Sequence, residues 1–168
     1  MLYVTVIVIT AVFILLLIVV LILVLVLQPM NGEPMQVAEN IWIGPLYSLK
    51  YQNKYRWDSV LSVTNFPKYP MENFVPFGMR SLHLIKKTLH ATNVSTPLHF
   101  IDNEIQNKLK LLIHDNNGMK DAISLLASFL SRKTNTPFTN VLQKLKSKVK
   151  SLQIDPSTIE FWNKIIAS

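Results

Sequence analysis

The first 27 residues form the most apolar stretch of the chain. They contain no charged side chain, and their polar positions are limited to Tyr3, Thr5 and Thr10. As an α-helix rising ~1.5 Å per residue, the stretch would be about 40 Å long, which exceeds the ~30 Å of bilayer hydrocarbon. A single segment in lipid can satisfy its own backbone hydrogen bonds only as a helix. The pattern therefore predicts a transmembrane helix over residues 1–27.

A cleaved signal peptide is the competing interpretation of the same residues. Such peptides begin with basic residues, have an apolar core of ~7–15 residues and end in small residues at the cleavage site. Here the core is longer, no Lys or Arg precedes it, and residues 25–29 (LVLQP) offer no pair of small side chains. The sequence therefore favours a retained signal anchor.

The basic residues indicate how the chain is oriented in the membrane. All 17 Lys and Arg follow the apolar segment, beginning with Lys50. Because basic residues are enriched on the cytosolic side of membrane proteins, a single-pass topology with a cytosolic domain is favoured. The sequon Asn93-Val94-Ser95 would matter only if the domain were lumenal.

After the apolar segment the pattern changes twice. Residues 28–36 include Pro29, Gly32 and Pro34 and have no periodicity, which predicts a short stiff linker. From residue 37 onward, short β-branched runs alternate with helical periodicity, which predicts one α/β domain over residues 37–168. We expect strands at residues 40–45, 59–64, 79–85 and 108–113, with a loop over 66–78.

The helical patterns predict four helices around the sheet. They are expected at residues 97–107, 121–132 and 137–152, with a last short helix from 155. The helix over 121–132 is apolar nearly all round, which is typical of a central, buried element. The sequence thus predicts a central sheet flanked by helices, preceded by one transmembrane helix.

The charge balance is basic, with 17 Lys and Arg against 10 Asp and Glu and a net charge of +7. This would suit nucleic acid, an anionic membrane or an acidic partner. Nucleic-acid binding lacks support, because there are only three arginines and no aromatic side chains among the lysines. A run of lysines at every second position is most simply interpreted as the solvent-exposed side of a helix. The alternative interpretation is that these lysines contact anionic lipid. Its members are Lys144, Lys146, Lys148 and Lys150.

The chain contains no cysteine, which excludes disulfides, thiolate zinc sites, iron–sulfur clusters and cysteine nucleophiles. Three of the four histidines, His83, His90 and His99, show no metal-binding spacing. Asp115, Asn117 and Gly118 match part of a calcium loop, but the glycine comes too early and the twelfth position lacks the required Glu. A magnesium-dependent aspartyl phosphate would need a further carboxylate beside Asp115. No metal or cofactor is expected.

Residues 108–121 combine a strand, a tight loop with Gly118 and the start of the central helix. This layout aims backbone N–H groups and a helix N-terminus at one point, which makes an anion site. With this layout at its centre, the whole segment 37–166 resembles the dual-specificity protein phosphatases. The matching segments are 40–44 (NIWIG), 58–63 (DSVLSV), 100–102 (FID), 111–114 (LLIH) with Gly118, and Ile154 with Pro156 and Phe161.

The resemblance implies a phosphate-binding loop in the frame of the family's HCxxGxxR signature. Its positions here are His114, Asp115, Asn116, Asn117, Gly118, Met119, Lys120 and Asp121. The nucleophilic cysteine of the family falls on Asp115 and the phosphate-binding arginine on Asp121. The family's general acid should lie near residues 84–88, where this chain has Lys86 and Lys87. The resemblance thus implies a family member without its catalytic groups.

Two structural roles remain open at the loop. The carboxylate of Asp115 either accepts hydrogen bonds from the loop N–H groups, filling the anion site, or faces solvent. His114, without a thiolate beside it, is expected to pack and hydrogen-bond beneath the loop. We therefore expect a membrane-anchored pseudophosphatase, which is a phosphatase-like domain without catalysis, acting as a scaffold or competitor for protein partners. The alternatives are an active but atypical phosphatase and a structural membrane or virion protein with a relic fold.

Overall fold

The computed structural model describes residues 13–20, 32–66, 75–90, 93–116, 118–149 and 152–167. The predicted transmembrane segment falls largely outside these ranges, since only residues 13–20 of it are described, as a helix. Among the described residues, no helix has both the length and the apolar content needed to cross a membrane.

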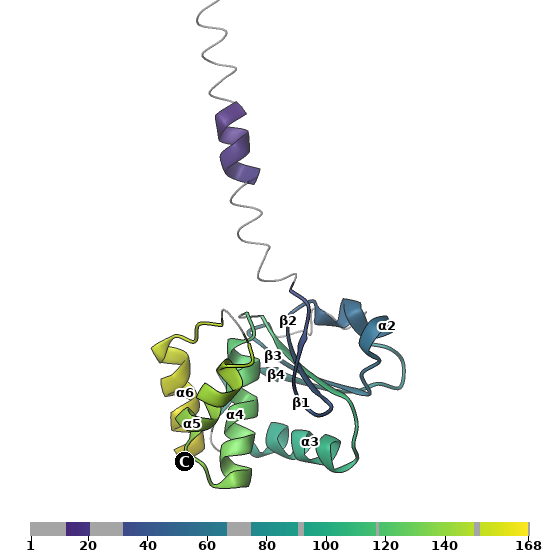
Figure 1. Cartoon of the computed structure of the whole chain (residues 1–168), viewed down its shortest axis with the longest axis vertical. Helices are drawn as coiled ribbons and strands as arrows, with labels where there is room; N and C mark the ends of the chain where they lie inside the picture. Colours follow the sequence, from purple (N-terminus) through teal and green to yellow (C-terminus); the bar gives the residue numbers. More distant parts are fainter. Residues whose placement is uncertain are drawn as a thin grey trace, which may run out of the picture.

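The domain is built on a five-stranded mixed sheet (Figure 1). The strands are β1 (Met35–Ala38), β2 (Ile41–Pro45), β3 (Ser59–Thr64), β4 (Arg80–Ile85) and β5 (Leu111–Asp115), in the spatial order β1-β2-β5-β3-β4. β1 runs antiparallel to β2, whereas β2, β5, β3 and β4 are mutually parallel. The carboxyl ends of the four parallel strands therefore meet at one edge of the sheet, where ligands of open α/β sheets usually bind.

The helices cover both faces of the sheet. One face packs against α3 (Ser95–Gln106), α4 (Lys120–Thr134), α5 (Phe138–Lys146) and α6 (Pro156–Ala167), while the other is covered by the 3-10 helix η2 (Ser48–Tyr51) and α2 (Gln52–Tyr55). Figure 1 shows α4, α5 and α6 gathered on one side and α2 on the other. A further 3-10 turn, η4 (Lys86–Thr88), follows β4 directly.

Residues of one strand alternate between the two hydrophobic cores. In β5, for example, Leu111 and Ile113 belong to the core under α3–α6, whereas Leu112 belongs to the core under η2 and α2. Strands buried on both faces are continuous apolar runs, which is why these segments could be found in the sequence. α4 is buried over ten of its residues, as expected for the central helix.

The element boundaries differ from the predicted ones at three places. β1 begins at Met35, inside the segment predicted as a linker, and it was not expected as a strand. The residues before β5 close the end of α3, because the N–H groups of Lys108 and Leu109 bond back to the carbonyls of Ile105 and Glu104. β5 consequently starts at Leu111 rather than at 108.

The helix predicted over 137–152 ends early. α5 stops at Lys146, and the next residues form tighter turns in which the N–H of Lys148 bonds to the Leu145 carbonyl and that of Val149 to the Lys146 carbonyl. Val149 still contributes to the core at 2% exposure. Val149 is therefore buried although it lies outside the helix.

Candidate functional site

The candidate site is the segment that joins β5 to α4 at the carboxyl edge of the sheet. Gly118 has a φ of +63° and Met119 a φ of +70°, both in the left-handed region. A left-handed conformation costs a non-glycine residue about 1–2 kcal/mol, so Met119 must be held in place by its surroundings. The two residues reverse the chain so that the first turn of α4 points back at the end of β5. Asn117 lies outside the described residues.

Asp115 occupies the centre of this turn. Its side chain is fully buried, Oδ1 accepts a hydrogen bond from the Met119 N–H at 2.8 Å, and Oδ2 accepts one from the Ala122 N–H at 2.8 Å. The first N–H groups of a helix have no partner within the helix and attract anions. Of the two roles left open for Asp115, hydrogen bonding to the loop is confirmed and the solvent-facing role is wrong.

Asp121, where the resemblance would place the family's arginine, is also buried, at 1% exposure. Its Oδ1 lies 2.7 Å from Nζ of Lys86 and accepts a hydrogen bond of 3.2 Å from Nε1 of Trp162. The ammonium of Lys86 also lies 5.2 Å from the ring centroid of Phe161. η4 and α6 thus both contribute to the surroundings of one carboxylate at the start of α4.

This ion pair was not found in the sequence. Lys86 was noted only as a departure at the expected general-acid position, and Asp121 only as a departure at the arginine position. The structure brings the two together, so the site carries a cation and an anion at positions where the resemblance implies an anion and a cation. The only signal in the sequence was that both positions differ in charge from the family's residues, in opposite directions. Because the two positions are far apart in the chain, this signal did not show that they are in contact.

A third carboxylate, Asp155, joins the starts of α4 and α6. It accepts hydrogen bonds from the Ser157 hydroxyl at 2.5 Å and the Thr158 N–H at 2.8 Å, and Lys120 Nζ lies 3.3 Å from Oδ2. The hydrogen bonds from Ser157 and Thr158, with the nearby Lys120, hold the pKa of Asp155 well below its usual range. Asp115, Asp121 and Asp155 are therefore each hydrogen-bonded or ion-paired by donors of the chain itself.

His114 lies beneath the loop, as expected, and is fully buried between β2 and β3, level with Gly44 and Ser62. Burial, with a smaller contribution from the charge of His83, lowers the pKa of His114 to about 3. Burial also lowers the pKa of His83, whose Nε2 lies 2.9 Å from the Thr64 hydroxyl. His114 is therefore neutral at physiological pH.

The buried His114 makes the stability of the domain dependent on pH. The unfolded chain binds a proton near pH 6.5, whereas folded His114 does so only near pH 3, so its contribution is complete above pH 6.5 and is lost as the pH falls. We expect the free energy of unfolding to fall by about 2 kcal/mol between pH 6.5 and 5, measured by urea denaturation. A His114→Gln variant should show a flatter dependence, and the exposed His99→Gln an unchanged one. Equal slopes for all three proteins would contradict this assignment.

The other predicted site residues lie around the edge or away from it. Asn116 accepts a hydrogen bond of 3.3 Å from the Asn65 N–H, which joins the ends of β5 and β3. Lys144 and Lys146 lie on α5, and Nζ of Lys148 donates to the Val37 carbonyl at 2.7 Å. Lys150 is outside the described residues. Within the described ranges, no three side chains of His, Asp or Glu come together as metal ligands.

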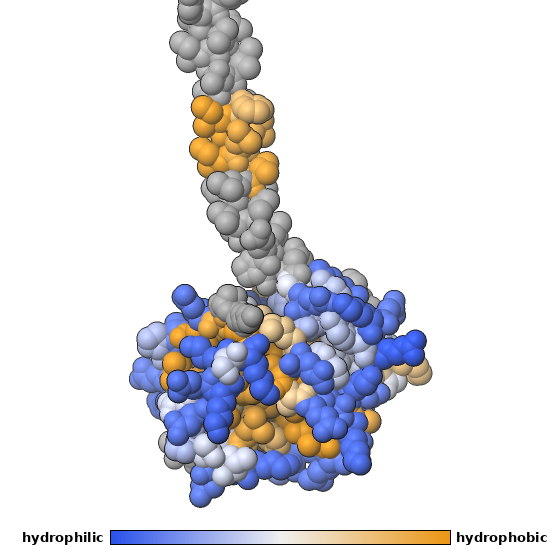
Figure 2. Space-filling view, viewed as in Figure 1, coloured by the Kyte–Doolittle hydropathy of each residue, from blue (hydrophilic) through white to orange (hydrophobic). Residues whose placement is uncertain are grey.

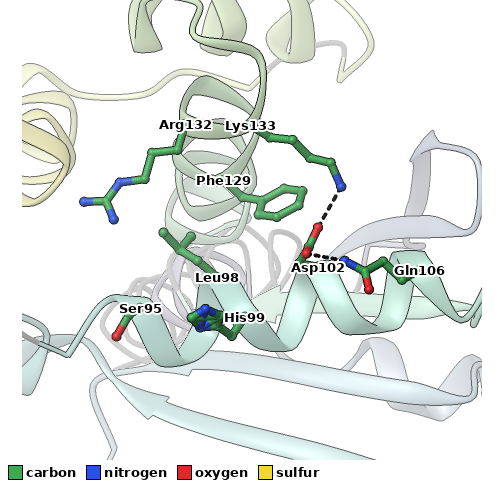
Figure 3. A pocket seen from close by; sticks show the side chains of 8 residues that line it. All are labelled: Ser95, Leu98, His99, Asp102, Gln106, Phe129, Arg132 and Lys133. Carbon is green, nitrogen blue, oxygen red and sulfur yellow. Dashed lines mark hydrogen bonds and ion pairs between the residues drawn. The ribbon is translucent and has the colours of Figure 1, made fainter.

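A separate groove of about 470 Å³ lies between α3 and α4, away from Asp115 (Figure 3). Asp102 lines this groove, paired with Lys133 at 2.6 Å and accepting a hydrogen bond from Gln106 at 2.6 Å. The hydrogen bond from Lys133 lowers the pKa of Asp102. The remaining lining residues are Ser95, Leu98, His99, Phe129 and Arg132. Asp102 is thus part of a surface groove and not of the candidate site.

The central strand of the mixed sheet ends in a tight loop that leads into a buried helix. This arrangement defines the class: the chain has a dual-specificity-phosphatase-like fold. It is similar to human DUSP28, with a TM-score of 0.65 and 12% identity over 83% of this chain and 96% of that one. It is similar to the human tyrosine phosphatase-like serine/threonine/tyrosine-interacting protein, with a TM-score of 0.63 and 14% identity over 80% and 96%.

A third similar structure is that of a leucine rich repeat and phosphatase domain containing protein from Entamoeba histolytica. Its TM-score is 0.62, with 18% identity over 80% of this chain and 91% of that one. No protein-family model and no curated protein matches the sequence. At these identities the likeness establishes the fold, so the function has to be argued from the residues of the site.

Proposed function

We propose that this chain is a membrane-anchored pseudophosphatase that acts by binding protein partners, as a scaffold or as a competitor of active relatives. The observation that carries the proposal is the position of the Asp115 carboxylate, which takes up the Met119 and Ala122 N–H groups of the loop. A phosphoryl group in such a loop would need these same donors.

The chemistry of the site supports the absence of catalysis. Cysteine-dependent phosphatases attack phosphorus with a thiolate and hold its oxygens with an arginine. This chain has no cysteine, and acids stand at both positions. At ~4 Å and an effective dielectric near 20, each carboxylate would raise the energy of a bound phosphate by about 4 kcal/mol per unit charge. Binding that depends on phosphate is therefore disfavoured, and partners are expected on the outer surface of the domain.

The N-terminal residues support the membrane anchor. Residues 1–27 carry no charge, and in the described helix over 13–20 all eight side chains are exposed and apolar, as the orange surface in Figure 2 shows. An exposed, uninterrupted apolar helix is unfavourable in water and suits lipid. All Lys and Arg follow this segment, which favours a cytosolic domain. Anchoring would raise the effective concentration of the domain for other membrane-bound partners.

One of the similar proteins is a tyrosine phosphatase-like serine/threonine/tyrosine-interacting protein, a name that supports a binding role on this fold. Its likeness to this chain, at 14% identity, extends to the fold alone. The binding role proposed here accordingly rests on the site residues.

The proposal predicts that the full-length chain does not hydrolyse phosphate esters. Purified chain in detergent, incubated with an aryl phosphate and with phosphopeptides, should release no more phosphate than its Asp115→Ala variant. An active dual-specificity phosphatase serves as the positive control. Turnover that Asp115→Ala abolishes would favour the atypical phosphatase instead.

A structural protein with a relic phosphatase fold would also fail to hydrolyse phosphate esters. Proximity labelling in cells distinguishes this alternative from the proposed binding role. The full chain should label a reproducible set of soluble proteins that a control carrying only residues 1–36 does not label. Identical label patterns for both proteins would favour a structural membrane or virion protein and overturn the binding role.

A further inference from the structure

The N-terminal segment reaches the domain at the same edge as the candidate site. β1 is antiparallel to β2, so its first residue, Met35, pairs with Ile43 near the carboxyl end of β2. The preceding Pro34 lies so close to Gly44 that a Cβ added there would be 3.0 Å from the Pro34 Cβ. Gly44 and the next residue are level with His114 and Asp115 of β5. A membrane anchor before residue 32 would therefore attach beside the candidate site.

The segment before β1 is also fastened to the domain. Glu33 accepts a hydrogen bond of 2.6 Å from the Tyr55 hydroxyl and pairs with Lys54, both on α2. Residues 33–35 are thus held at three points, by α2, Gly44 and Ile43. We call this side of the domain the site edge: the carboxyl ends of β2, β3, β4 and β5 and the described residues that directly follow each of them.

The site edge exposes aromatic and basic side chains. Tyr47, after β2, is 38% exposed, and Phe66, after β3, is 43% exposed. Lys50 on η2 and Lys87 on η4 are exposed as well. Among the described residues of the domain, one further large apolar side chain is exposed, Phe77, which precedes β4 and thus lies toward the opposite edge of the sheet.

The basic end of α5 approaches the site edge too. α4 starts at this edge, and α5 follows it after a short connection and packs against it, so α5 runs back toward the edge. The segment after α5 ends at Asp155, which is paired with Lys120 at the start of α4. The carboxyl end of α5, with Lys144 and Lys146, therefore points toward the site edge, and the turn that follows it is bonded to β1 through Lys148 and the Val37 carbonyl.

We propose that the site edge is a membrane-contacting surface that binds anionic lipid headgroups through its lysines, with Tyr47 and Phe66 at the lipid–water interface. The inference rests on the proposed membrane anchor and adds the orientation of the domain to it. Tyr and other aromatic side chains are favoured at the interface, and lysines are attracted to the negative cytosolic leaflet. The loop around Asp115 then faces the bilayer, and the groove between α3 and α4 remains open to the cytosol.

The absence of native cysteine allows the orientation to be measured with single probes. Tyr47→Cys, Phe66→Cys and Phe77→Cys variants of the full-length chain are each labelled with an environment-sensitive fluorophore. They are then reconstituted into vesicles of phosphatidylcholine with or without phosphatidylserine. With phosphatidylserine, the probes at 47 and 66 should shift to the blue, brighten roughly two-fold and be quenched by lipid-borne quenchers. The probe at 77 should behave as in water in both vesicles.

A charge change provides the matched control for the lipid contact. Lys87→Glu should reduce the response of the probe at 66, whereas Lys108→Glu, before the start of β5 at the opposite edge, should leave it unchanged. Blue shifts at all three probes, or equal responses in both vesicles, would overturn the inference.

Flotation of the same samples separates this inference from the proposed anchor. A chain that floats with the vesicles while the probes at 47 and 66 stay in water overturns the orientation and leaves the anchor intact. A chain that does not float with either vesicle overturns both.

Discussion

Replacing Asp115 with alanine should lower the free energy of unfolding by about 3–5 kcal/mol, because one buried and one partly buried N–H group lose their acceptor at about 1–3 kcal/mol each and a cavity is left. The donors are those of Met119 and Ala122. Urea denaturation of the full-length chain in detergent, followed by tryptophan fluorescence, measures the change, since Trp42, Trp57 and Trp162 are all buried.

Two further variants define what the Asp115 carboxylate does. Asp115→Asn keeps one acceptor oxygen but presents an NH₂ group to the second N–H, so its loss should be intermediate. Asp102→Ala, which removes a partly exposed carboxylate paired with Lys133, should cost less than about 1 kcal/mol. If Asp115→Ala were no more destabilising than Asp102→Ala, the carboxylate would not hold the loop.

The stabilising role of Asp115 links the fold to the proposed function. A loop of N–H groups aimed at one point is costly to bury without an acceptor. Here that acceptor is the carboxylate of Asp115, which is part of the chain. A domain that supplies its own anion can keep the shape of the loop permanently, and it then has no need of phosphate for its structure.

Replacing Lys86 with methionine should cost about 3–5 kcal/mol, because it leaves the carboxylate of Asp121 buried without its counter-ion. Asp121 is 1% exposed, and its Oδ2 atom has no hydrogen-bond partner among the described residues, so the ammonium of Lys86 carries most of the compensation. The same urea denaturation measures the loss.

Lys87→Met is the matched control, because Lys87 is exposed on the same 3-10 turn and should change stability by no more than about 0.5 kcal/mol. The double variant Lys86→Met with Asp121→Leu should recover at least about 2 kcal/mol of the loss, since it removes both charges together. Equal effects of Lys86→Met and Lys87→Met would show that the ion pair contributes nothing to stability.

The ion pair also bears on the proposed absence of catalysis. Asp121 depends on Lys86, because its carboxylate is 1% exposed and would otherwise be buried without a counter-ion, whereas the side chain of Lys86 is 20% exposed. If Asp121 stands at the arginine position, as the resemblance implies, replacing Asp115 with cysteine would leave a carboxylate there, paired with a lysine. In the proposed function, the inactive state then involves three elements, η4, α4 and α6, in addition to the missing thiol.

Much of the architecture follows from the sequence. Strands β2, β3 and β5 are buried throughout, and helix α4 is buried over most of its length, so both kinds of element are visible in the sequence as runs of apolar residues. Helix α3 shows its buried side chains at helical spacing. The composition also excluded cysteine chemistry, and the order of strand, glycine and buried helix located the loop at residues 114–121.

The sequence did not determine the parts that depend on contacts between distant segments. β1 is a four-residue edge strand of mixed composition that exists only because β2 lies beside it, and α5 ends where Lys148 reaches the Val37 carbonyl. Only the tertiary structure decided that Asp115 turns inward and that Asp121 meets Lys86, 35 residues away. Periodicity reports which face of an element is buried, whereas the partner of a buried charge is chosen by how the elements pack.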